Sequence, residues 1–456
     1  MKTKWVHGCV AALLAGVTPL ALYGFSTGPP QRRTAVPADG GQNCTVCHTT
    51  FAPANSDPRG RIAIQVDPYV PGVKQIIRVT VEHPEASRWG FQLTARLASD
   101  ETKPAGTFTP SATVRVRCDA AGDAPCNGAT EFASHLRAGD ADSTRPGASG
   151  GNTWEIEWTP PATDVGPIRL YAAGNAANNS NSNAGDRVYT TNLRLNAACN
   201  LTGRPVLNTN GVINAASFGS AISPNALISI FGTSLAGAGT TRVAAPFDFE
   251  DGKYPRELAC IGVEIGGQRA PVIFASPNQI NAQAPSLTAT GPVPVAVLLN
   301  PGRPNQIRGE LSGVTLLNVA PALFTFNGRN LAALHTNFDI VGDPATLRFD
   351  RPVRPAKPGD TVLLFGTGFG PTNPAAQAGD VPAAQATITG QVAVTIGGLT
   401  LRPEDVLYAG LAPALISGLY QFNVRIPATT SDGDVAVVLS MGSSASQAGA
   451  TIRVQR

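Results

Sequence analysis

Residues 75–81 read QIIRVTV, in which Ile77, Val79 and Val81 alternate with polar residues. This period of two is typical of a half-buried β-strand, because successive side chains of a strand point to opposite faces of its sheet. The same alternation recurs between residues 61 and 196, where Gly, Pro, Asp and Asn separate the strand-like segments. The further segments are 61–66 (RIAIQV), 91–97 (FQLTARL), 113–117 (TVRVR), 153–159 (TWEIEWT) and 168–172 (IRLYA). Short strands separated by turns predict a β-sandwich.

The second half of the chain contains an internal repeat. Residues 226–235 (ALISIFGTSL) match residues 360–369 (DTVLLFGTGF), and both segments contain Phe-Gly-Thr. Two more matches follow in the same order: 263–267 (VEIGG) with 394–398 (VTIGG), and 279–285 (QINAQAP) with 421–427 (QFNVRIP). Ordered self-similarity of this kind predicts a duplicated β-domain. The alternation and the repeat together predict an all-β chain of three consecutive β-sandwich domains.

The 456 residues divide into six predicted segments. They are a signal peptide (residues 1–30), a tether that contains Cys44, Cys47 and His48 (31–60), a first sandwich (61–200), the first repeat (208–320), a connector (321–355) and the second repeat (356–456). Only 14% of the residues are charged, and the net charge of +3 comes from scattered basic residues. A chain without a basic patch has no electrostatic support for nucleic acid binding, so we expect no nucleic acid partner.

The first thirty residues are typical of an export signal. Lys2 and Lys4 precede an apolar stretch at residues 9–23 (CVAALLAGVTPLALY). This stretch is shorter than the roughly 20 apolar residues that span a bilayer, although an uncleaved membrane anchor is the alternative. Cleavage predicts a secreted, periplasmic or extracellular protein with no integral membrane segment.

Cleavage would remove Cys9 and leave an even number of cysteines, which favours disulfides in an oxidising compartment. Cys118 and Cys126 bracket a turn-rich segment, DAAGDAP, so we predict a local disulfide between them. Cys199 and Cys260 are then left to pair where the first two sandwiches meet.

The clearest chemical signal is Cys44-Thr45-Val46-Cys47-His48, a Cys-x-x-Cys-His run of the kind that attaches haem c. Its two thiols can bond to the vinyl-derived carbons of one porphyrin edge, and the histidine can bind the iron as proximal ligand. One covalent haem c is therefore the predicted cofactor. A plain Cys44–Cys47 disulfide is the main alternative. A thioredoxin-like redox pair is disfavoured, because it would need a βαβ context that this β-rich chain lacks. A zinc site is also disfavoured, because it would need two further nearby ligands.

We expect the sixth iron ligand to be another histidine, because Met441 is the only methionine besides the initiator and lies in the last domain. His335 falls in the connector, whereas His83 and His135 belong to the first sandwich. A ligand from the same domain is favoured, so we predict His135 as the distal ligand, with His83 as the runner-up.

Four blocks of the first sandwich resemble the bacterial Reeler-like domain, which is also described as the choice-of-anchor V type. These blocks are residues 44–48 (CTVCH), 83–93 (HPEASRWGFQL), 154–158 (WEIEW) and 171–178 (YAAGNAAN). The resemblance covers about residues 40–196 and implies an exported β-sandwich. It also implies a haem motif near the start of the domain and a histidine in the segment that corresponds to His135.

The C-terminal half is similar to a pair of TIG-type immunoglobulin-like modules at the ends of secreted bacterial proteins. Its matching blocks are residues 212–218 (VINAASF), 230–233 (IFGT) and 276–281 (SPNQIN). This resemblance implies no catalytic residues, and the sequence contains neither a His-Glu-x-x-His nor a Walker motif. We therefore expect that the protein is not an enzyme.

These observations favour two classes of function. The first is a secreted, non-enzymatic haem c protein that transfers electrons to an unidentified redox partner, or that senses redox state or a diatomic gas. The second is an adhesion or binding protein with an unidentified extracellular surface ligand, in which Cys44 and Cys47 form only a disulfide. Tandem immunoglobulin-like domains fit either class, because function cannot be inferred from the fold itself.

Overall fold

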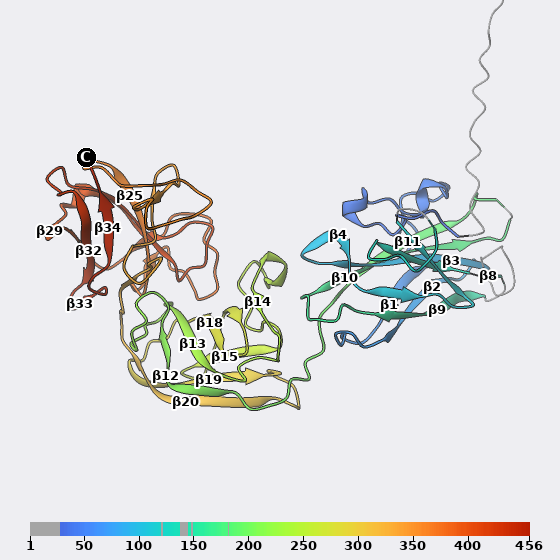
Figure 1. The fold of residues 1–456 in the computed structure, drawn as a ribbon. Coiled ribbons are helices and arrows are strands. Elements are labelled where there is room, and N and C mark those ends of the chain that lie inside the picture. Colours follow the sequence, from blue (N-terminus) through green and yellow to red (C-terminus); the bar gives the residue numbers. More distant parts are fainter. Residues whose placement is uncertain (1–27, 120–121, 137–144, 147–148, 181) are drawn as a thin grey trace, which may run out of the picture.

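The structure is a computed structural model that describes residues 28–119, 122–136, 145–146, 149–180 and 182–456. Most of the predicted signal peptide therefore lies outside the described residues. The described chain folds into three β-sandwiches that follow one another in sequence (Figure 1), which confirms the predicted all-β fold class. Its helical segments are the 3₁₀ turns η1 (Pro37–Asp39), η2 (Cys44–Val46), η3 (Pro246–Asp248) and η4 (Pro403–Asp405). Within these described ranges, no helix has the length and apolarity needed to cross a membrane.

The first sandwich buries its core between two antiparallel sheets. One sheet has the order β1 (Arg61–Gln65), β2 (Gln75–His83), β9 (Gly150–Thr159) and β5 (Thr107–Thr109). The other has the order β11 (Arg187–Leu195), β10 (Ile168–Ala177), β3 (Arg88–Leu97), β7 (Glu131–His135) and β6 (Val114–Cys118), and β4 (Asp100–Pro104) and β8 (Arg145–Pro146) also pair with β3. Trp89, Trp154 and Trp158 fill the core between them. We refer to the sheet that contains β3 and β10 as the β10 sheet.

The second and third sandwiches are also built from two sheets each. In the second sandwich, one sheet has the order β12 (Val206–Asn214), β13 (Leu227–Thr233), β18 (Gln279–Gln283), β17 (Val272–Ala275) and β14 (Arg242–Val243). Its other sheet has the order β16 (Gln268–Ala270), β15 (Ile261–Ile265), β19 (Gly291–Leu299) and β20 (Ile307–Leu316). In the third, the larger sheet has the order β24 (Val353–Arg354), β23 (Ile340–Val341), β22 (Ala333–His335), β25 (Thr361–Thr367), β31 (Tyr420–Arg425), β30 (Val406–Leu411), β27 (Thr387–Ile388) and β26 (Thr372–Asn373), with β21 (Ala322–Leu323) also on β25. Its smaller sheet has the order β29 (Leu399–Thr400), β28 (Ala393–Ile396), β32 (Gly433–Met441) and β33 (Ser444–Ala445), with β34 (Thr451–Val454) also on β32.

The two repeats pair their equivalent strands in the same register. In the second sandwich β13 pairs with β18, and Phe231 lies opposite Gln279. In the third sandwich β25 pairs with β31, and Phe365 lies opposite Gln421. The sequence matches align Phe231 with Phe365 and Gln279 with Gln421. The repeat in the sequence is therefore also a repeat of strand pairing.

The prediction of a connector at residues 321–355 is wrong. β21 and β22 pair with β25, β23 pairs with β22, and β24 extends the sheet beyond β23. Leu323, Ala333 and Val341 are buried in the third core. Each of these strands has only two or three residues. A run of that length is too short for an alternating pattern to show in the sequence.

The segment predicted as a tether, residues 31–60, packs on the β10 sheet. Arg33 N donates to Gln92 Oε1 at 2.7 Å. The Arg96 guanidinium donates to Asp39 Oδ2 at 2.7 Å, and this ion pair is almost completely buried. Polar groups of this segment therefore find partners on the outer face of β3.

Both predicted disulfides are present. Cys118 and Cys126 close the turn after β6, and their Cα atoms are 5.2 Å apart. Cys199 and Cys260 are joined with a Cα separation of 5.3 Å. Both separations lie within the range of about 4.4–6.8 Å that a disulfide requires.

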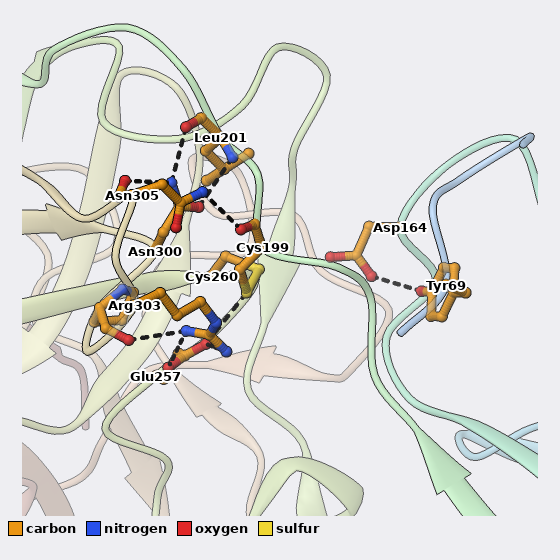
Figure 2. Close-up of a disulfide and its surroundings, with 10 residues drawn as sticks. Tyr69, Asp164, Cys199, Leu201, Glu257, Cys260, Asn300, Arg303 and Asn305 are labelled. Carbon is orange, nitrogen blue, oxygen red and sulfur yellow. Dashed lines mark hydrogen bonds and ion pairs between the residues drawn. A yellow bond between two sulfur atoms is a disulfide. The ribbon is translucent and has the colours of Figure 1, made fainter. Parts of the chain in front are cut away.

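The second disulfide anchors the chain that leads from the first sandwich into the second (Figure 2). Cys199 follows β11, and Cys260 directly precedes β15. Next to the disulfide, Leu201 N donates to Asn300 Oδ1 at 2.9 Å, and Asn300 Nδ2 donates to Leu201 O at 2.8 Å. A covalent bond and a reciprocal pair of hydrogen bonds therefore fix this segment to the second sandwich.

Candidate haem-attachment site

Cys44, Cys47 and His48 lie on one helical turn near the start of the described chain. The turn begins at Asn43, whose side-chain oxygen accepts a hydrogen bond from Thr45 N at 2.9 Å. The N–H groups of Cys47 and His48 both donate to Cys44 O, at 3.2 and 3.0 Å. Residues three apart on a helical turn are neighbours on one side of it. The two cysteines therefore share a side of the turn, and His48 follows directly.

The thiols of Cys44 and Cys47 are free, and both residues are half-buried. Burial is the main cause that raises the pKa of Cys44 to about 12, and the neighbouring Cys47 thiol adds to it. Cys44 is therefore a neutral thiol at physiological pH, and a neutral thiol reacts poorly in disulfide exchange. The alternative disulfide is not formed in this structure, so both sulfurs remain able to bond to another group.

A buried carboxylate holds His48. Its Nδ1 lies 2.8 Å from Asp186 Oδ2, and the side chains of His48 and Asp186 are 17% and 2% exposed. An ionised carboxylate only accepts hydrogen bonds, so this contact assigns the imidazole proton to Nδ1. Nε2 then carries the lone pair, and it has no hydrogen-bond partner among the described residues. A histidine with one nitrogen bonded to a carboxylate and the other free is arranged as a metal ligand.

Asp186 is itself held by β10 and the loop that follows it. Asn175 Nδ2 donates to Asp186 Oδ2 at 3.2 Å, and Asn178 N donates to Asp186 Oδ1 at 3.2 Å. From the same loop, Asn183 Nδ2 donates to Cys47 O at 2.6 Å. Sequence reasoning missed Asp186, because an acidic residue beside an Asn- and Gly-rich segment is ordinary turn composition.

His135, the predicted distal ligand, ends β7 and is only 5% exposed. Its Nδ1 accepts from Phe91 N at 2.9 Å or, when it carries the proton, donates to Phe91 O at 3.1 Å. Its Nε2 is buried without a hydrogen-bond partner. Burial disfavours the imidazolium and lowers the pKa of His135 to about 4. The ring is therefore neutral at physiological pH, and the tautomer protonated at Nδ1 offers the Nε2 lone pair.

The two imidazoles lie close to one residue pair of the β10 sheet. Gly90 of β3 is opposite Asn175 of β10. A Cβ atom on Gly90 would lie 2.7 Å from His135 Cε1, so the ring rests against this glycine and leaves no room for a larger residue. Asn175 Nδ2 is 3.4 Å from His48 Nδ1, and Asn175 Oδ1 is buried without a partner. The structure thus places His48 and His135 near the same end of one sheet.

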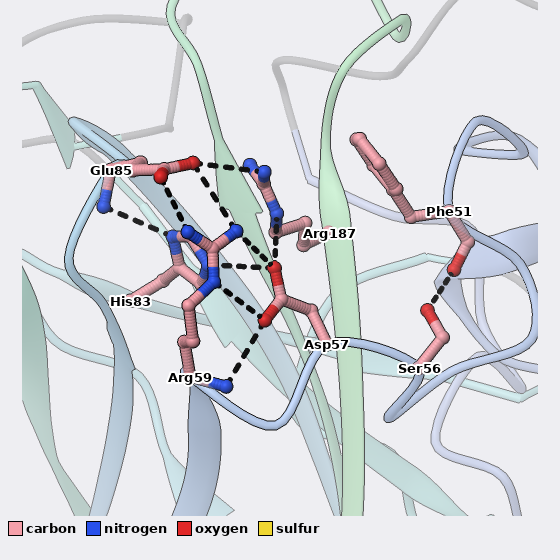
Figure 3. Close-up of polar contacts among 7 residues, drawn as sticks. All are labelled: Phe51, Ser56, Asp57, Arg59, His83, Glu85 and Arg187. Carbon is pink, nitrogen blue, oxygen red and sulfur yellow. Dashed lines mark hydrogen bonds and ion pairs between the residues drawn. The ribbon is translucent and has the colours of Figure 1, made fainter.

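His83, the runner-up ligand, belongs to the other sheet and to a network of charged side chains (Figure 3). Its Nε2 lies 3.2 Å from Asp57 Oδ2, and its Nδ1 accepts from Glu85 N at 3.1 Å. Asp57 also accepts hydrogen bonds from Arg59 and Arg187. Both ring nitrogens of His83 are in use, so it lacks the free nitrogen that an iron ligand needs.

Replacement of Asp57 by asparagine is expected to remove an acid-dependent part of the stability of the first sandwich. Hydrogen bonds from Arg59, with smaller contributions from His83 and Arg187, hold the pKa of Asp57 well below its usual range. Such a carboxylate stabilises the fold at pH values above its unfolded pKa of about 3.9, and this stability is lost as the pH falls further. Urea midpoints measured from about pH 6 to about pH 3 should therefore fall more steeply in the wild type than in Asp57→Asn. Urea midpoints that fall equally with pH in the wild type and in Asp57→Asn would contradict this contribution of Asp57 to stability.

Comparisons with known proteins establish no family for this chain. No family model matches it, and no curated protein matches it. Solved structures with similarity include the human F-spondin reeler domain, with 16% identity over 31% of this chain and 88% of that chain and a TM-score of 0.21. They also include the Bacteroides ovatus mixed-linkage glucan utilization locus protein SGBP-B in complex with a heptasaccharide (12% identity, 89% of this chain, 69% of that chain, TM-score 0.24). An uncharacterized Nocardia farcinica protein with an immunoglobulin-like fold matches at 14% identity, over 30% of this chain and 99% of that chain, with a TM-score of 0.18. At these identities and TM-scores, the similarities support no statement about function.

Proposed function

We propose that the first sandwich carries one covalent haem c and that the exported protein transfers single electrons to a redox partner outside the cytoplasm. The observation that carries the proposal is the turn at Cys44–His48, with two free thiols on one side and a histidine whose Nδ1 is bound by Asp186. Haem c supplies an iron that gains and loses one electron. The disulfides Cys118–Cys126 and Cys199–Cys260 agree with an oxidising compartment, where such a haem is attached.

Two further observations, on the cysteines and on His135, fit a haem at this site. Cys44 and Cys47 are both free, which is the reduced form that thioether bonds to haem require. His135 offers a second, buried imidazole nitrogen without a hydrogen-bond partner. An unpartnered buried polar atom costs about 1–3 kcal/mol of folding free energy, and a ligand that binds it would offset this cost. Coordination to iron would supply that interaction.

The identity of the sixth ligand decides which redox role the protein can have. With His48 and His135 both bound, the iron has no open position and is suited to electron transfer. With His48 alone, an open position could bind a diatomic gas, and the protein would suit sensing. The proposal assigns no catalytic residue, because neither role requires a chemical change in another substrate.

The full-length chain should be exported from a host with an active cytochrome c maturation system and then purified. We expect a coloured protein whose Soret band remains with the polypeptide after acid–acetone extraction, because that solvent removes haem that is not covalently bound. A colourless protein from this host would overturn the proposal. It would favour the adhesion class, in which Cys44 and Cys47 are only a disulfide.

A His135→Ala variant is expected to convert the low-spin visible spectrum of the haem protein to a high-spin spectrum. The change removes a strong-field ligand without touching the thioether bonds, so the haem content per chain should stay the same. His83→Gln is the matched control, because both nitrogens of His83 are already bound by Asp57 and Glu85. A His135→Ala spectrum that stays low-spin would rule out His135 as the sixth ligand.

A further inference from the structure

Asp186 has no cationic partner other than His48 among the described residues, although it is one of the most deeply buried carboxylates of the first sandwich. The neighbouring Arg187 side chain binds Asp57 and Glu85 instead. The two Asp186 oxygens are occupied by His48 Nδ1, the Asn175 amide and Asn178 N. This buried carboxylate is therefore directed at a single imidazole.

The contact affects two properties of His48. It fixes the plane of the ring and keeps the proton on Nδ1, so Nε2 faces away from the carboxylate with its lone pair available. It also places a negative charge 2.8 Å from the Nδ1 atom, which increases the electron donation of the ring through Nε2. A stronger donor stabilises Fe³⁺ more than Fe²⁺.

We propose that Asp186 is the positioning residue of the haem site, and that it lowers the reduction potential of the iron through His48. Asn175 and Asn178 take part by holding the carboxylate in place. This inference rests on the proposed function, because it concerns the iron that His48 would bind. Asp186 does not contact that iron and acts only through the imidazole.

The test compares Asp186→Asn with the wild-type haem protein. Asparagine has nearly the same shape and can still accept a hydrogen bond from His48, but it carries no charge. We expect the covalent haem content to stay the same and the reduction potential to rise by about 59 mV or more. This shift is a tenfold change of the one-electron equilibrium in favour of Fe²⁺. It matches the lower end of the 10–100-fold effects that such partners have on metal affinity or activity. Asp186→Glu restores the charge and should return part of the shift.

Asp57→Asn is the matched control, because Asp57 is a half-buried carboxylate of the same sandwich and it too contacts a histidine, His83. Its potential should stay at the wild-type value. Equal potentials in Asp186→Asn and wild type would overturn the role of Asp186, as would equal shifts in Asp186→Asn and Asp57→Asn.

If Asp186→Asn does not fold, Asn175→Ala replaces it, because this change removes only one of the hydrogen bonds to Asp186. A smaller rise in potential is then expected, and no rise would overturn the inference. A wild-type protein without haem would instead refute the proposed function itself, so the two failures are distinguishable.

Discussion

A chain in which Cys44 and Cys47 are both replaced by serine is expected to contain no covalent haem. The effect should be complete rather than partial, because a serine hydroxyl does not form the thioether bond and both attachment points are lost. His48 and Asp186 remain in this variant, so loosely bound haem could still colour the protein. Absorbance at the Soret maximum per chain, measured after acid–acetone extraction, separates bound from loose haem and should fall to the baseline.

The matched control is the Cys118→Ser/Cys126→Ser variant, which removes two other cysteines of the same sandwich. Those cysteines form a local disulfide and lie outside the haem motif. This variant should lose stability but keep the same covalent haem per folded chain. Haem that survives in the Cys44→Ser/Cys47→Ser variant, or that disappears equally from both variants, would contradict the role of the motif.

Replacement of Asp39 by asparagine is expected to lower the stability of the first sandwich by about 3–5 kcal/mol, the cost of removing one partner of a buried ion pair. The side chains of Arg96 and Asp39 are 2% and 6% exposed, and their atoms are 2.7 Å apart. Without the carboxylate, the Arg96 charge stays buried with only Thr94 and a backbone carbonyl as hydrogen-bond partners. Urea denaturation followed by tryptophan fluorescence measures the change.

Asp123→Asn provides the comparison, because Asp123 pairs with Arg115 on the surface of the same sandwich. Exposed pairs of this kind contribute about 0–1 kcal/mol. Both substitutions remove one carboxylate charge, so a large difference between their losses of stability measures the effect of burying the ion pair. Equal losses in the two variants would show that the Asp39–Arg96 pair does not hold residues 31–60 on the β10 sheet.

The sequence predicts the sheets of this protein well wherever strands are long enough to alternate. QIIRVTV and TWEIEWT become β2 and β9, which pair with each other, and the two Phe-Gly-Thr segments become the equivalent strands β13 and β25. The strands at residues 321–355 could not be predicted in this way, because a strand of two or three residues is too short to show an alternation of apolar and polar residues. The repeat itself could be found, since it depends on similarity between segments rather than on their length.

The candidate site was only partly predictable. The spacing of Cys44, Cys47 and His48 is local and appears directly in the sequence. Asp186 could not be found, because it reaches His48 across 138 positions through the strand pairing of β10 and β11. The same is true of Gly90, whose lack of a side chain matters only because the His135 ring lies against it. The packing of residues 31–60 depends on polar partners on β3 that no local pattern reveals.

Mass spectrometry of the exported protein tests the haem attachment most directly. A proteolytic fragment that contains residues 44–48 is expected to carry the added mass of one haem, with Cys44 and Cys47 resistant to alkylation before and after reduction. A fragment of unmodified mass, in which Cys44 and Cys47 are joined by a disulfide and become alkylated only after reduction, would contradict an electron-carrying haem in this protein.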